Sequence, residues 1–297
     1  MSNLVDRYDR HAHRYRVHWA PVLAPTALRL LDVVAAWLPD AGVGTTVLDV
    51  GAGTGTLSHE IMRRWPRADV VALDPSAGML AVARASTPAA AGPRTIVAPA
   101  DAMPLPDASV DLVVSSFALQ LVPDRPAALR EIHRVLRAGG HLAYVTWLDR
   151  DESFAPHEAF DDAVLDLGVE EPDEADEDRA GDLASPAAAA AQMRRAGFRD
   201  VSARVNELRH AWTLESFLAY KVGYDDEGLI RSLSRADRAR LDRIARRRLA
   251  ALGIEDFVWS TNVVMVVGAR PPLSRRAGTL RSAARTARDP RPRSPAG

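Results

Sequence analysis

Residues Thr46 to Leu57 read TVLDVGAGTGTL, and this stretch decides the fold class of the chain. A short apolar run carries an acid at Asp49, and glycines follow at alternate positions, 51, 53 and 55. An apolar run of this length is typical of a buried strand. A glycine-rich turn after it lets a ligand approach the backbone, because no Cβ stands in the way. The stretch therefore predicts a strand, a ligand-binding turn and then a helix.

The same rhythm continues outward from this stretch to about residue 147. Short apolar runs predict strands at 46–50, 69–74, 95–99, 110–116 and 141–147. Helical patterns lie between them at 56–65, 76–86 and 125–140, the last of which ends in two glycines as a helix stop would. Strands rich in Val and Leu suit a sheet buried on both faces, and their alternation with helices implies right-handed crossovers. We expect an α/β fold with a doubly wound sheet.

The flanking segments differ in character. Residues 1–40 have a helical pattern, and after Trp147 the rhythm stops until a helix, a turn and a strand return over 185–205. Further helical stretches are expected near 213–223 and 234–252, and a last strand at 262–267. The acid-rich stretch 170–182 is expected to be a solvated loop. The predicted organisation is a helical lid, an α/β core, a covering insertion with the final strands, and a disordered basic tail, at 1–40, 41–150, 151–270 and 271–297.

Composition narrows the function classes. The chain has 297 residues, a net charge of −1, 47% hydrophobic residues and no cysteine. Disulfides and thiolate chemistry are excluded, and no histidine or acid spacing matches a metal site. Neither a signal peptide nor an uninterrupted run of the ~18–20 apolar residues that span a membrane is evident. We expect a cytoplasmic protein without a nucleic-acid partner, either a monomer or a homodimer.

Two common ligands of glycine turns fit poorly. A dinucleotide turn has the pattern G-x-G-x-x-G, but here the third position falls on Thr56. A carboxylate at Asp49 would also repel a pyrophosphate, whereas it suits a ligand that carries an ammonium group. A P-loop is excluded because no Lys followed by Ser or Thr comes after the glycines. A nicotinamide-dependent oxidoreductase is therefore disfavoured.

S-adenosylmethionine meets these constraints better. Asp49 and the turn carbonyls can take its ammonium group. Asp74, 19 residues beyond Gly55, stands where an acid accepts ribose hydroxyls in dinucleotide folds. Asp101 follows the third predicted strand and can accept the adenine amino group, while the amide of Ala102 can donate to a ring nitrogen. Acids at the carboxyl ends of three consecutive strands open into one crevice.

The chain resembles the class I S-adenosylmethionine-dependent methyltransferases, in particular the small-molecule branch that includes the ubiquinone and menaquinone methyltransferases. The matching segments are VLDVGAGTG, VVALDPSAGML, ADAMPLPDASVDLVVSSFALQLVPD and ALREIHRVLRAGGHLAY, which cover about residues 46–146. Two positions depart from the pattern: Ala138 replaces a usual Pro, and Gln120 replaces a His of many members. The resemblance implies a Rossmann-like sheet of seven strands with the last antiparallel. It also implies cofactor contacts at Asp49, Gly51, Ala52, Gly53, Gly55, Asp74, Pro75, Met79, Asp101, Ala102 and the segment Ser115–Phe117. Tyr15, in the N-terminal helical segment, is a further candidate contact near the sulfonium.

The acceptor side is less defined. Methyl transfer gains most from alignment and exclusion of water, and a base is needed only if the acceptor must lose a proton. Candidate catalytic groups are His11, His18 and Tyr15, with solvent exposure or core packing as the alternative for each. Candidate substrate contacts are Trp19, Trp147, Tyr220 and Tyr224, for which core packing is again the alternative. The expected function is methyl transfer to a phenol, a quinone or a natural-product-like acceptor; the alternative is cofactor binding without catalysis.

Overall fold

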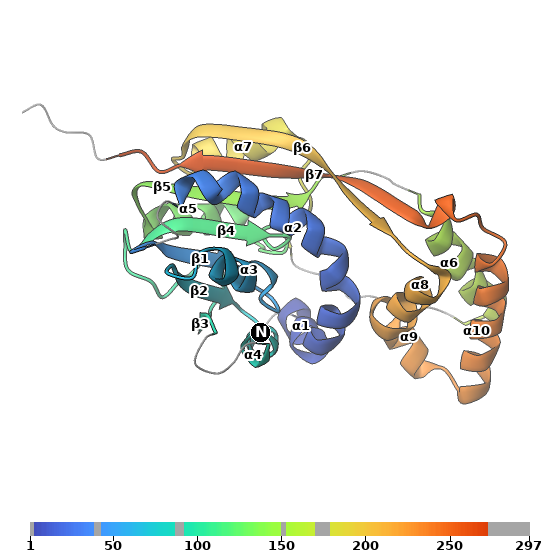
Figure 1. The fold of residues 1–297 in the computed structure, drawn as a ribbon. Coiled ribbons are helices and arrows are strands. Elements are labelled where there is room, and N and C mark those ends of the chain that lie inside the picture. The colour runs from blue at the N-terminus through green and yellow to red at the C-terminus, as the bar shows by residue number, and fades with distance from the viewer. Residues whose placement is uncertain (1–2, 39–42, 87–91, 150–152, 170–178, 273–297) are drawn as a thin grey trace, which may run out of the picture.

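The computed structural model describes residues 3–38, 43–86, 92–149, 153–169 and 179–272. Seven strands form one sheet in the order β3-β2-β1-β4-β5-β7-β6 (Figure 1). β1 pairs in parallel with β2 and β4, whereas β7 is antiparallel to both β5 and β6. The expected doubly wound sheet with an antiparallel last strand is confirmed.

The strands alternate with helices through the first half of the chain. The strands are β1 (Thr46–Val50), β2 (Asp69–Asp74), β3 (Arg94–Val97), β4 (Val110–Ser116), β5 (Leu136–Trp147), β6 (Arg199–Ala211) and β7 (Val258–Ala269). The helices that pack on the sheet are α2 (Ala20–Val34), α3 (Thr56–Arg64), α4 (Ala77–Ala85), α5 (Arg125–Val135) and α7 (Pro186–Arg195). Near-continuous burial of β1, β2 and β4 explains why most of their residues are apolar.

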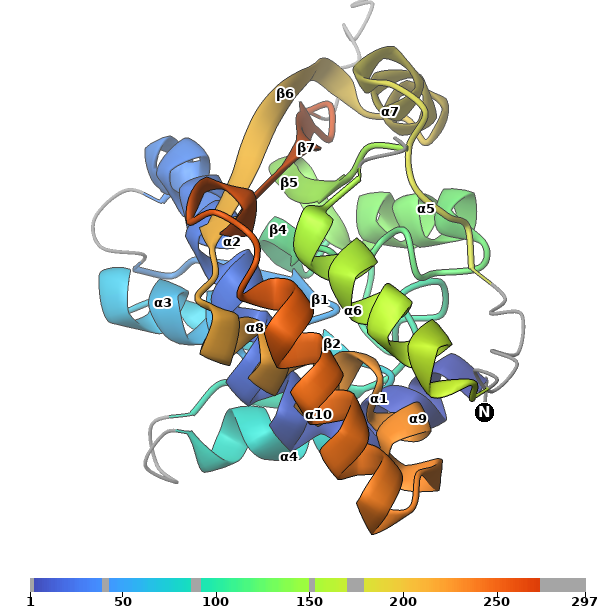
Figure 2. The same ribbon diagram turned by 90° about the vertical axis from the view of Figure 1, so that its right-hand side faces the viewer.

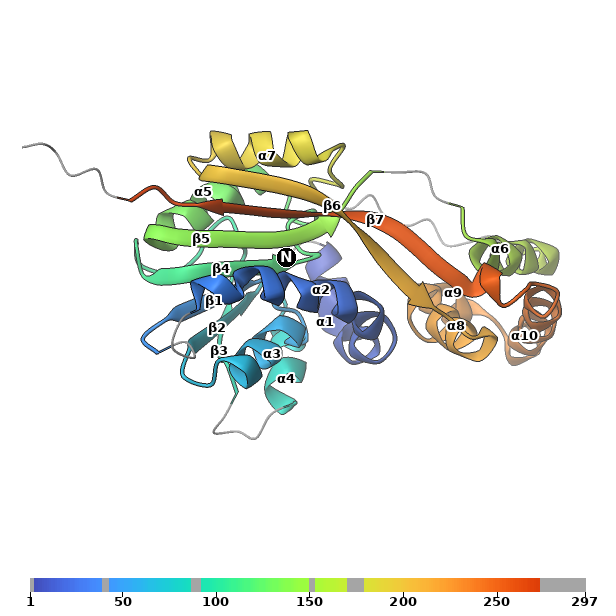
Figure 3. The same cartoon turned by 45° about the horizontal axis from the view of Figure 1, so that its top comes forward.

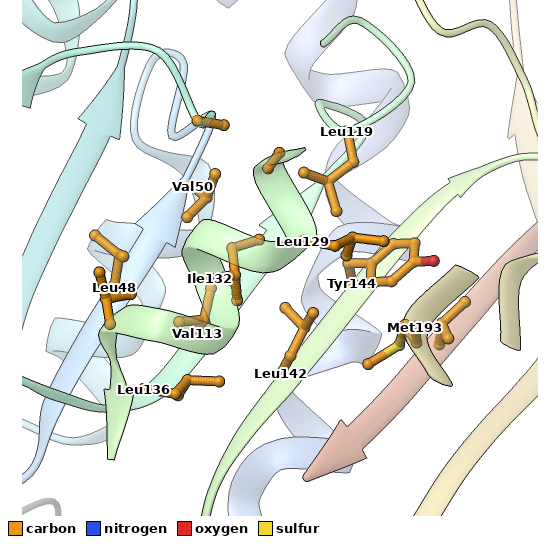
Figure 4. Packing of buried hydrophobic residues seen from close by; sticks show 14 of the residues in the cluster. Leu48, Val50, Val113, Leu119, Leu129, Ile132, Leu136, Leu142, Tyr144 and Met193 are labelled. Carbon is orange, nitrogen blue, oxygen red and sulfur yellow. The ribbon is translucent and has the colours of Figure 1, made fainter. Parts of the chain in front are cut away.

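Each face of the sheet has its own core. On one face, Leu30 and Leu31 of α2 and Ile61 of α3 pack against alternate residues of the strands. On the other face, α5 and α7 cover Leu48, Val113 and Tyr144, as Figure 4 shows from close by. All of these side chains are at most 1% exposed, so burial on both faces fixes the register of the strands.

The end of α5 differs from the sequence expectation. The helix was expected to run to the glycines at 139 and 140, but it ends at Val135 and β5 begins at Leu136. The glycines lie instead at an irregularity of the ladder, between the pairs Val110–Leu136 and Leu112–His141. Gly139 has a φ of 83°, and a Cβ on Gly140 would lie 2.8 Å from the carbonyl oxygen of Asp111. Glycine pairs suit a bulge as well as a helix end, so the sequence signal was ambiguous.

The N-terminal segment is helical almost throughout. α1 (Asn3–Arg14) continues through the π-helical turn η1 (Tyr15–Trp19) into α2, and the 3₁₀ turn η2 (Ala35–Trp37) follows. By length and composition alone the run Leu4–Trp37 could cross a membrane. Its residues Leu30, Leu31 and Val34 are completely buried, in a core with side chains of the sheet, as in a core helix.

A second group of helices lies beyond the carboxyl-terminal end of β5, around the extension of β6 and β7 (Figures 1 and 3). β6 and β7 continue as a two-stranded ribbon past the last β5 pair, Trp147–Val263, and helices surround the far end of the ribbon (Figures 1 and 3). These are α6 (Ala155–Leu167), α8 (Leu214–Tyr220), the π-helical turn η4 (Lys221–Asp225), α9 (Glu227–Ser232), α10 (Arg235–Leu249) and the 3₁₀ turn η5 (Glu255–Phe257). Figure 2 views this group, here named the outer helices, face on.

The outer helices were only partly expected. The stretches predicted near 213–223 and 234–252 correspond to α8 with η4 and to α10, but α6 was not predicted. Phe160 of α6 and Leu241 of α10 are buried in one core, so α6 is held by packing rather than by a strong local signal. Most of the acid-rich stretch 170–182 and of the tail 271–297 lies outside the described residues.

Candidate cofactor site

The glycine turn after β1 is tied to the end of β2. The amides of Gly51 and Ala52 both donate to the carbonyl oxygen of Leu73, at 2.8 and 3.0 Å. Gly51 has a φ of 69°, and a Cβ there would lie 2.2 Å from the Cβ of Ala118. Gly53 has a φ of 54° with open space where a Cβ would be. Both positions favour glycine, the first for close packing and the second for an open approach to the backbone.

A cavity of about 490 Å³ opens beside this turn. Its walls come from the carboxyl ends of β1, β2 and β4, from the segment after β3, and from α1 and η1. Predicted cofactor contacts that line it are Gly51, Gly53, Asp74, Pro75, Met79, Asp101, Phe117 and Tyr15. A smaller adjoining pocket of about 30 Å³ includes Ala52 in its wall. The volume is within the range of about 300–1,000 Å³ that small-molecule sites occupy.

Asp74 is the most constrained acid of the site. Its Oδ2 accepts a hydrogen bond from the amide of Gly53 at 2.8 Å, and its Oδ1 accepts one from the amide of Ser76 at 2.9 Å. Burial raises the pKa of Asp74 to about 6, despite these two hydrogen bonds, which act in the opposite direction. The residue is 8% exposed and lines the cavity, and each carboxylate oxygen can accept a further hydrogen bond beyond the one it makes. This position fits an acceptor for ligand hydroxyl groups.

Asp49 lies away from the cavity wall. It is 1% exposed, and its Oδ2 accepts hydrogen bonds from the amide of Ser58 at 3.0 Å and from the Ser58 hydroxyl at 2.7 Å. Burial raises the pKa of Asp49 to about 7. Ser58 is in the first turn of α3, so Asp49 ties the turn to the start of that helix. We therefore replace the expected direct contact with a ligand ammonium group by a role in shaping the turn.

Of the neighbouring residues Asp101 and Ala102, only Asp101 lines the cavity. Asp101 lines the cavity, as expected. The amide of Ala102 instead donates to the carbonyl oxygen of Pro99 at 3.3 Å, and Ala102 is not part of the cavity wall. The turn that presents Asp101 uses this amide for its own closure.

The end of β4 forms a further wall. Ser116 and Phe117 line the cavity, whereas the predicted Ser115 is fully buried and points to the other face of the strand. Phe117 has a φ of 51°, which is unusual for a bulky residue. Its amide donates to Val145 at 2.9 Å, and its carbonyl accepts from Nε2 of Gln120 at 2.8 Å. Gln120, which replaces a His of many family members, thus makes a hydrogen bond to the backbone of a residue that lines the cavity.

The candidate catalytic groups divide between two locations. Tyr15 lines the cavity, and burial, with the nearby Tyr8 and Asp74, raises its pKa. His11 and His18 do not line it: Nδ1 of His11 lies 3.6 Å from Glu227, and His18 packs on Gly223, where a Cβ would lie 2.7 Å from Nε2. Burial lowers the pKa of both histidines.

The predicted substrate contacts form an aromatic cluster behind the cavity wall. Trp19 stacks on Tyr220 with ring centroids 5.3 Å apart, and the ring centroids of Trp147 and Phe117 are 4.5 Å apart. Tyr224 contacts Tyr15 edge to face at 6.0 Å. Trp19, Trp147, Tyr220 and Tyr224 do not line the cavity. Packing therefore accounts for the positions of these rings.

Several cavity residues were not among the sequence predictions. Leu4, Val5 and Tyr8 come from α1, and Leu121, Val122 and Pro123 come from the loop before α5. A periodic signal existed for Tyr8, which shares a helical face with Tyr15. Apolar loop residues carry no comparable signal, because a sequence does not show which loops border a cavity.

Comparisons with known proteins agree with this geometry. Residues 48–144 match the methyltransferase domain family. Over 101 residues the chain is 44% identical to a malonyl-[acyl-carrier protein] O-methyltransferase from Methylococcus capsulatus, which covers 34% of this chain and 37% of that protein. The fold is shared with YcgJ from Bacillus subtilis (TM-score 0.53, 18% identity, 82% of this chain and 97% of that chain). It is also shared with the [4+2]-cyclase SpnF (TM-score 0.51, 19% identity, 82% and 80%).

The matched region is a class I S-adenosylmethionine-dependent methyltransferase domain. The chain matches 37% of the length of the first curated relative, and the family match ends at residue 144, before the first of the outer helices begins. The cofactor of the class is S-adenosylmethionine, and the site fits it: Gly53 leaves the backbone open, and Asp74 and Asp101 present acids at the ends of two strands.

Proposed function

We propose that this protein transfers a methyl group from S-adenosylmethionine to a small-molecule acceptor, either free or linked to a carrier. The observation that carries the proposal is the cavity that the glycine turn, Asp74 and Asp101 share at the carboxyl ends of neighbouring strands. When bound, S-adenosylmethionine supplies an electrophilic methyl group on a sulfonium.

The chain's own residues bind and orient in this proposal. Asp74 accepts hydrogen bonds from ribose hydroxyls, and Asp101 accepts one from the adenine amino group. Tyr8, Tyr15 and Phe117 place aromatic side chains at the cavity wall, where they exclude water. An aromatic face near a sulfonium adds roughly 0.5–2 kcal/mol of attraction.

Proton removal places a condition on the acceptor. Among the described residues that line the cavity, the titratable side chains are Tyr8, Tyr15, Asp74 and Asp101. Tyr15 stays protonated at neutral pH because its pKa is raised, so its hydroxyl can donate a hydrogen bond but does not act as a phenolate base. An acceptor that is already ionised, such as a carboxylate or an acidic phenol, needs no protein base.

Of the two ionised acceptors, a carboxylate and an acidic phenol, the similarity to the curated relatives favours the carboxylate. Their name, malonyl-[acyl-carrier protein] O-methyltransferase, describes methylation of a carrier-linked acid in those proteins. Phenols, quinones and natural-product-like molecules remain acceptors to be tested. Cofactor binding without methyl transfer is the competing proposal, since the same fold serves a cyclase.

The first experiment is calorimetric titration with S-adenosylmethionine, S-adenosylhomocysteine and NADH. Asp74→Ala is the test variant, and Asp69→Ala is the matched control, because Asp69 is an exposed acid at the opposite end of the same strand. We expect adenosyl ligands to bind with micromolar dissociation constants to the wild type and the control, and at least tenfold more weakly to Asp74→Ala. Preference for NADH would refute the proposal.

The second experiment measures release of S-adenosylhomocysteine with carboxylic acids, carrier-linked acids, phenols and quinones. Turnover with any of them supports methyl transfer. Tight binding of the adenosyl ligands without turnover on all four classes would favour the non-catalytic alternative.

A further inference from the structure

α1 is held at the edge of the cavity by an acid that the sequence did not single out. Asp9 lies in the middle of α1, and its Oδ1 accepts hydrogen bonds from the hydroxyl of Ser76 at 2.5 Å and from the amide of Gly78 at 2.8 Å. Ser76 precedes α4, and Gly78 is in the first turn of that helix. A carboxylate at a helix N-terminus is stabilised by the unpaired amides and by the helix dipole. Asp9 thus caps a helix whose N-cap residue, Ser76, lies 67 residues later in the chain.

The backbone of α1 approaches α4 equally closely. A Cβ on Gly78 would lie 2.7 Å from the carbonyl oxygen of Asp9, so only glycine permits this distance. The same helix places Leu4, Val5 and Tyr8 on the cavity wall. The contact between Asp9 and α4 therefore sets how α1 borders the cavity.

Ser76 connects this contact to the cofactor acid. Its amide donates to Oδ1 of Asp74 at 2.9 Å, while its hydroxyl donates to Asp9 and accepts a hydrogen bond from the amide of Met79 at 3.0 Å. Ser76 is 1% exposed, and both Ser76 and Met79 line the cavity. One buried serine thus fixes two carboxylates, of which one lies in α1 and the other ends β2.

We propose that Asp9 is a positioning residue for the cofactor, which seats α1 on α4 and orients Asp74 through Ser76. Ligand binding and docking of α1 are then coupled, because each stabilises the arrangement that the other needs. The inference rests on the proposed function, since the ligand that Asp74 meets is taken to be S-adenosylmethionine. It adds a role to a residue that does not itself line the cavity.

The test compares Asp9→Ala and Gly78→Ala with the control Asp6→Ala, which removes an acid from the same helix outside the cavity wall. Asp9→Ala removes the carboxylate, whereas Gly78→Ala forces the backbones apart and keeps the carboxylate. Asp9→Asn keeps an acceptor oxygen and serves as the conservative variant. The readouts are the affinity for S-adenosylhomocysteine, the KM for S-adenosylmethionine, the kcat, and hydrogen exchange of amides 3–14 with and without ligand.

We expect S-adenosylhomocysteine to slow exchange of amides 3–14 in the wild type and in Asp6→Ala. Both test variants should lose that protection and bind roughly tenfold more weakly, in line with the loss of a capping contact. The KM should rise while the kcat at saturating cofactor changes less than twofold, and Asp9→Asn should recover most of the affinity.

Two results would overturn the inference. Wild-type affinity in Asp9→Ala would show that Asp9 does not position the cofactor site. Lower thermal stability with unchanged affinity and unchanged ligand protection would show that its role is structural only. Failure of the wild type to bind S-adenosylhomocysteine would instead refute the proposed function, and this inference with it.

Discussion

The amide of Gly53 donates a hydrogen bond to Oδ2 of Asp74 at 2.8 Å, which joins the glycine turn after β1 to the acid that ends β2. Two sequence features that lie 21 positions apart are thus parts of one binding surface. The carboxylate holds the turn, and the turn leaves the carboxylate's remaining lone pairs available to a ligand. Gly51 and Gly53 have different roles in this turn, so substitutions at the two positions should have different effects.

Gly51→Ala should mainly lower the stability of the protein, whereas Gly53→Ala should mainly weaken ligand binding. Both residues have a positive φ, which costs an alanine about 1–2 kcal/mol. At Gly51 the new Cβ would also overlap Ala118, and overpacking adds about 1–3 kcal/mol. At Gly53 the new Cβ meets no protein atom and projects into the space that a ligand needs.

Thermal unfolding and calorimetry distinguish the two variants. Gly51→Ala should lose several degrees more in Tm than Gly53→Ala. Gly53→Ala should stay folded and bind S-adenosylhomocysteine at least tenfold more weakly than the wild type. Gly44→Ala is the control, because it also has a positive φ and open space but lies before β1. Equal Tm losses at positions 51 and 53 would contradict the assignment.

The core of the fold was predictable because its signals are local. Apolar runs mark β1, β2 and β4 at their observed bounds, since strands buried on both faces are mostly apolar. The outer helices were harder to predict. α6 depends on contacts with α10, which lies some 80 residues away, and such tertiary burial leaves only a weak helical pattern.

The sequence indicated which strand ends form the candidate site, but it did not indicate which side chains at those ends point into the cavity. Asp74, Asp101 and Phe117, which the sequence suggests as cofactor contacts, line the cavity, and their contacts with a cofactor stay predictions. Asp49 does not line it, because a sequence shows that an acid near the end of a strand precedes a glycine turn but not whether a buried hydroxyl such as Ser58 already satisfies that acid. Ser115 and Ser116 illustrate the same limit, since a one-residue difference selects opposite faces of a strand.

Cofactor affinity should depend on pH through Asp74. Ligand hydroxyls donate to the carboxylate, and burial raises the pKa of Asp74 to about 6. Protonation below that pH removes acceptor capacity, so affinity should fall as the pH is lowered from 7 to 5, by up to about tenfold for each pH unit below the pKa.

Titration calorimetry with S-adenosylhomocysteine between pH 5 and 8 measures this dependence. The carboxylate and the ammonium group of the ligand keep their charges across that interval, and Asp74→Ala provides the reference profile. A wild-type profile as flat as that of Asp74→Ala would show that a different group governs the affinity.

Protein stability should depend on pH through Asp49, in the direction set by burial. The pKa of Asp49 rises from 3.8 to about 7 in the folded protein, so folding favours its protonated form. The resulting stabilisation is complete below pH 3.8 and is lost as the pH rises through 7. Asp49→Asn, which has no charge to bury and keeps an acceptor for Ser58, should be more stable than the wild type at pH 8 by at least about 1.4 kcal/mol, the equivalent of one pKa unit.

Urea unfolding at pH 5 and pH 8 measures the Asp49 effect. The difference between Asp49→Asn and the wild type should be larger at pH 8 than at pH 5. Asp69→Asn, at an exposed position of the neighbouring strand, should show no such difference. A variant that is less stable than the wild type at pH 8 would mean that the charged carboxylate is favoured by its contacts with Ser58.

Lys221 should be essential for the packing of the turn η4 within the outer helices, because its partners lie at the end of that turn and on α6. It is the only lysine in the chain, it is 4% exposed, and its Nζ lies 2.6 Å from Asp226 and 2.9 Å from Asp225. Burial raises the pKa of Asp226 to about 6 even though the lysine opposes this effect. Lys221→Met would leave these acids without their buried cation, which costs about 3–5 kcal/mol in comparable pairs.

A double-mutant cycle tests the Lys221 prediction and its consequence for the site. Lys221→Met should lower the free energy of unfolding strongly, and adding Asp226→Asn should restore part of it, because the second change removes the uncompensated charge. Tyr224 belongs to the same π-helical turn and contacts Tyr15 at the cavity wall, so the single variant should also weaken cofactor binding. Additive effects of the two substitutions would show that Asp226 does not depend on Lys221. Recovery of affinity together with stability in the double variant would connect this buried pair to the cavity through the two tyrosines.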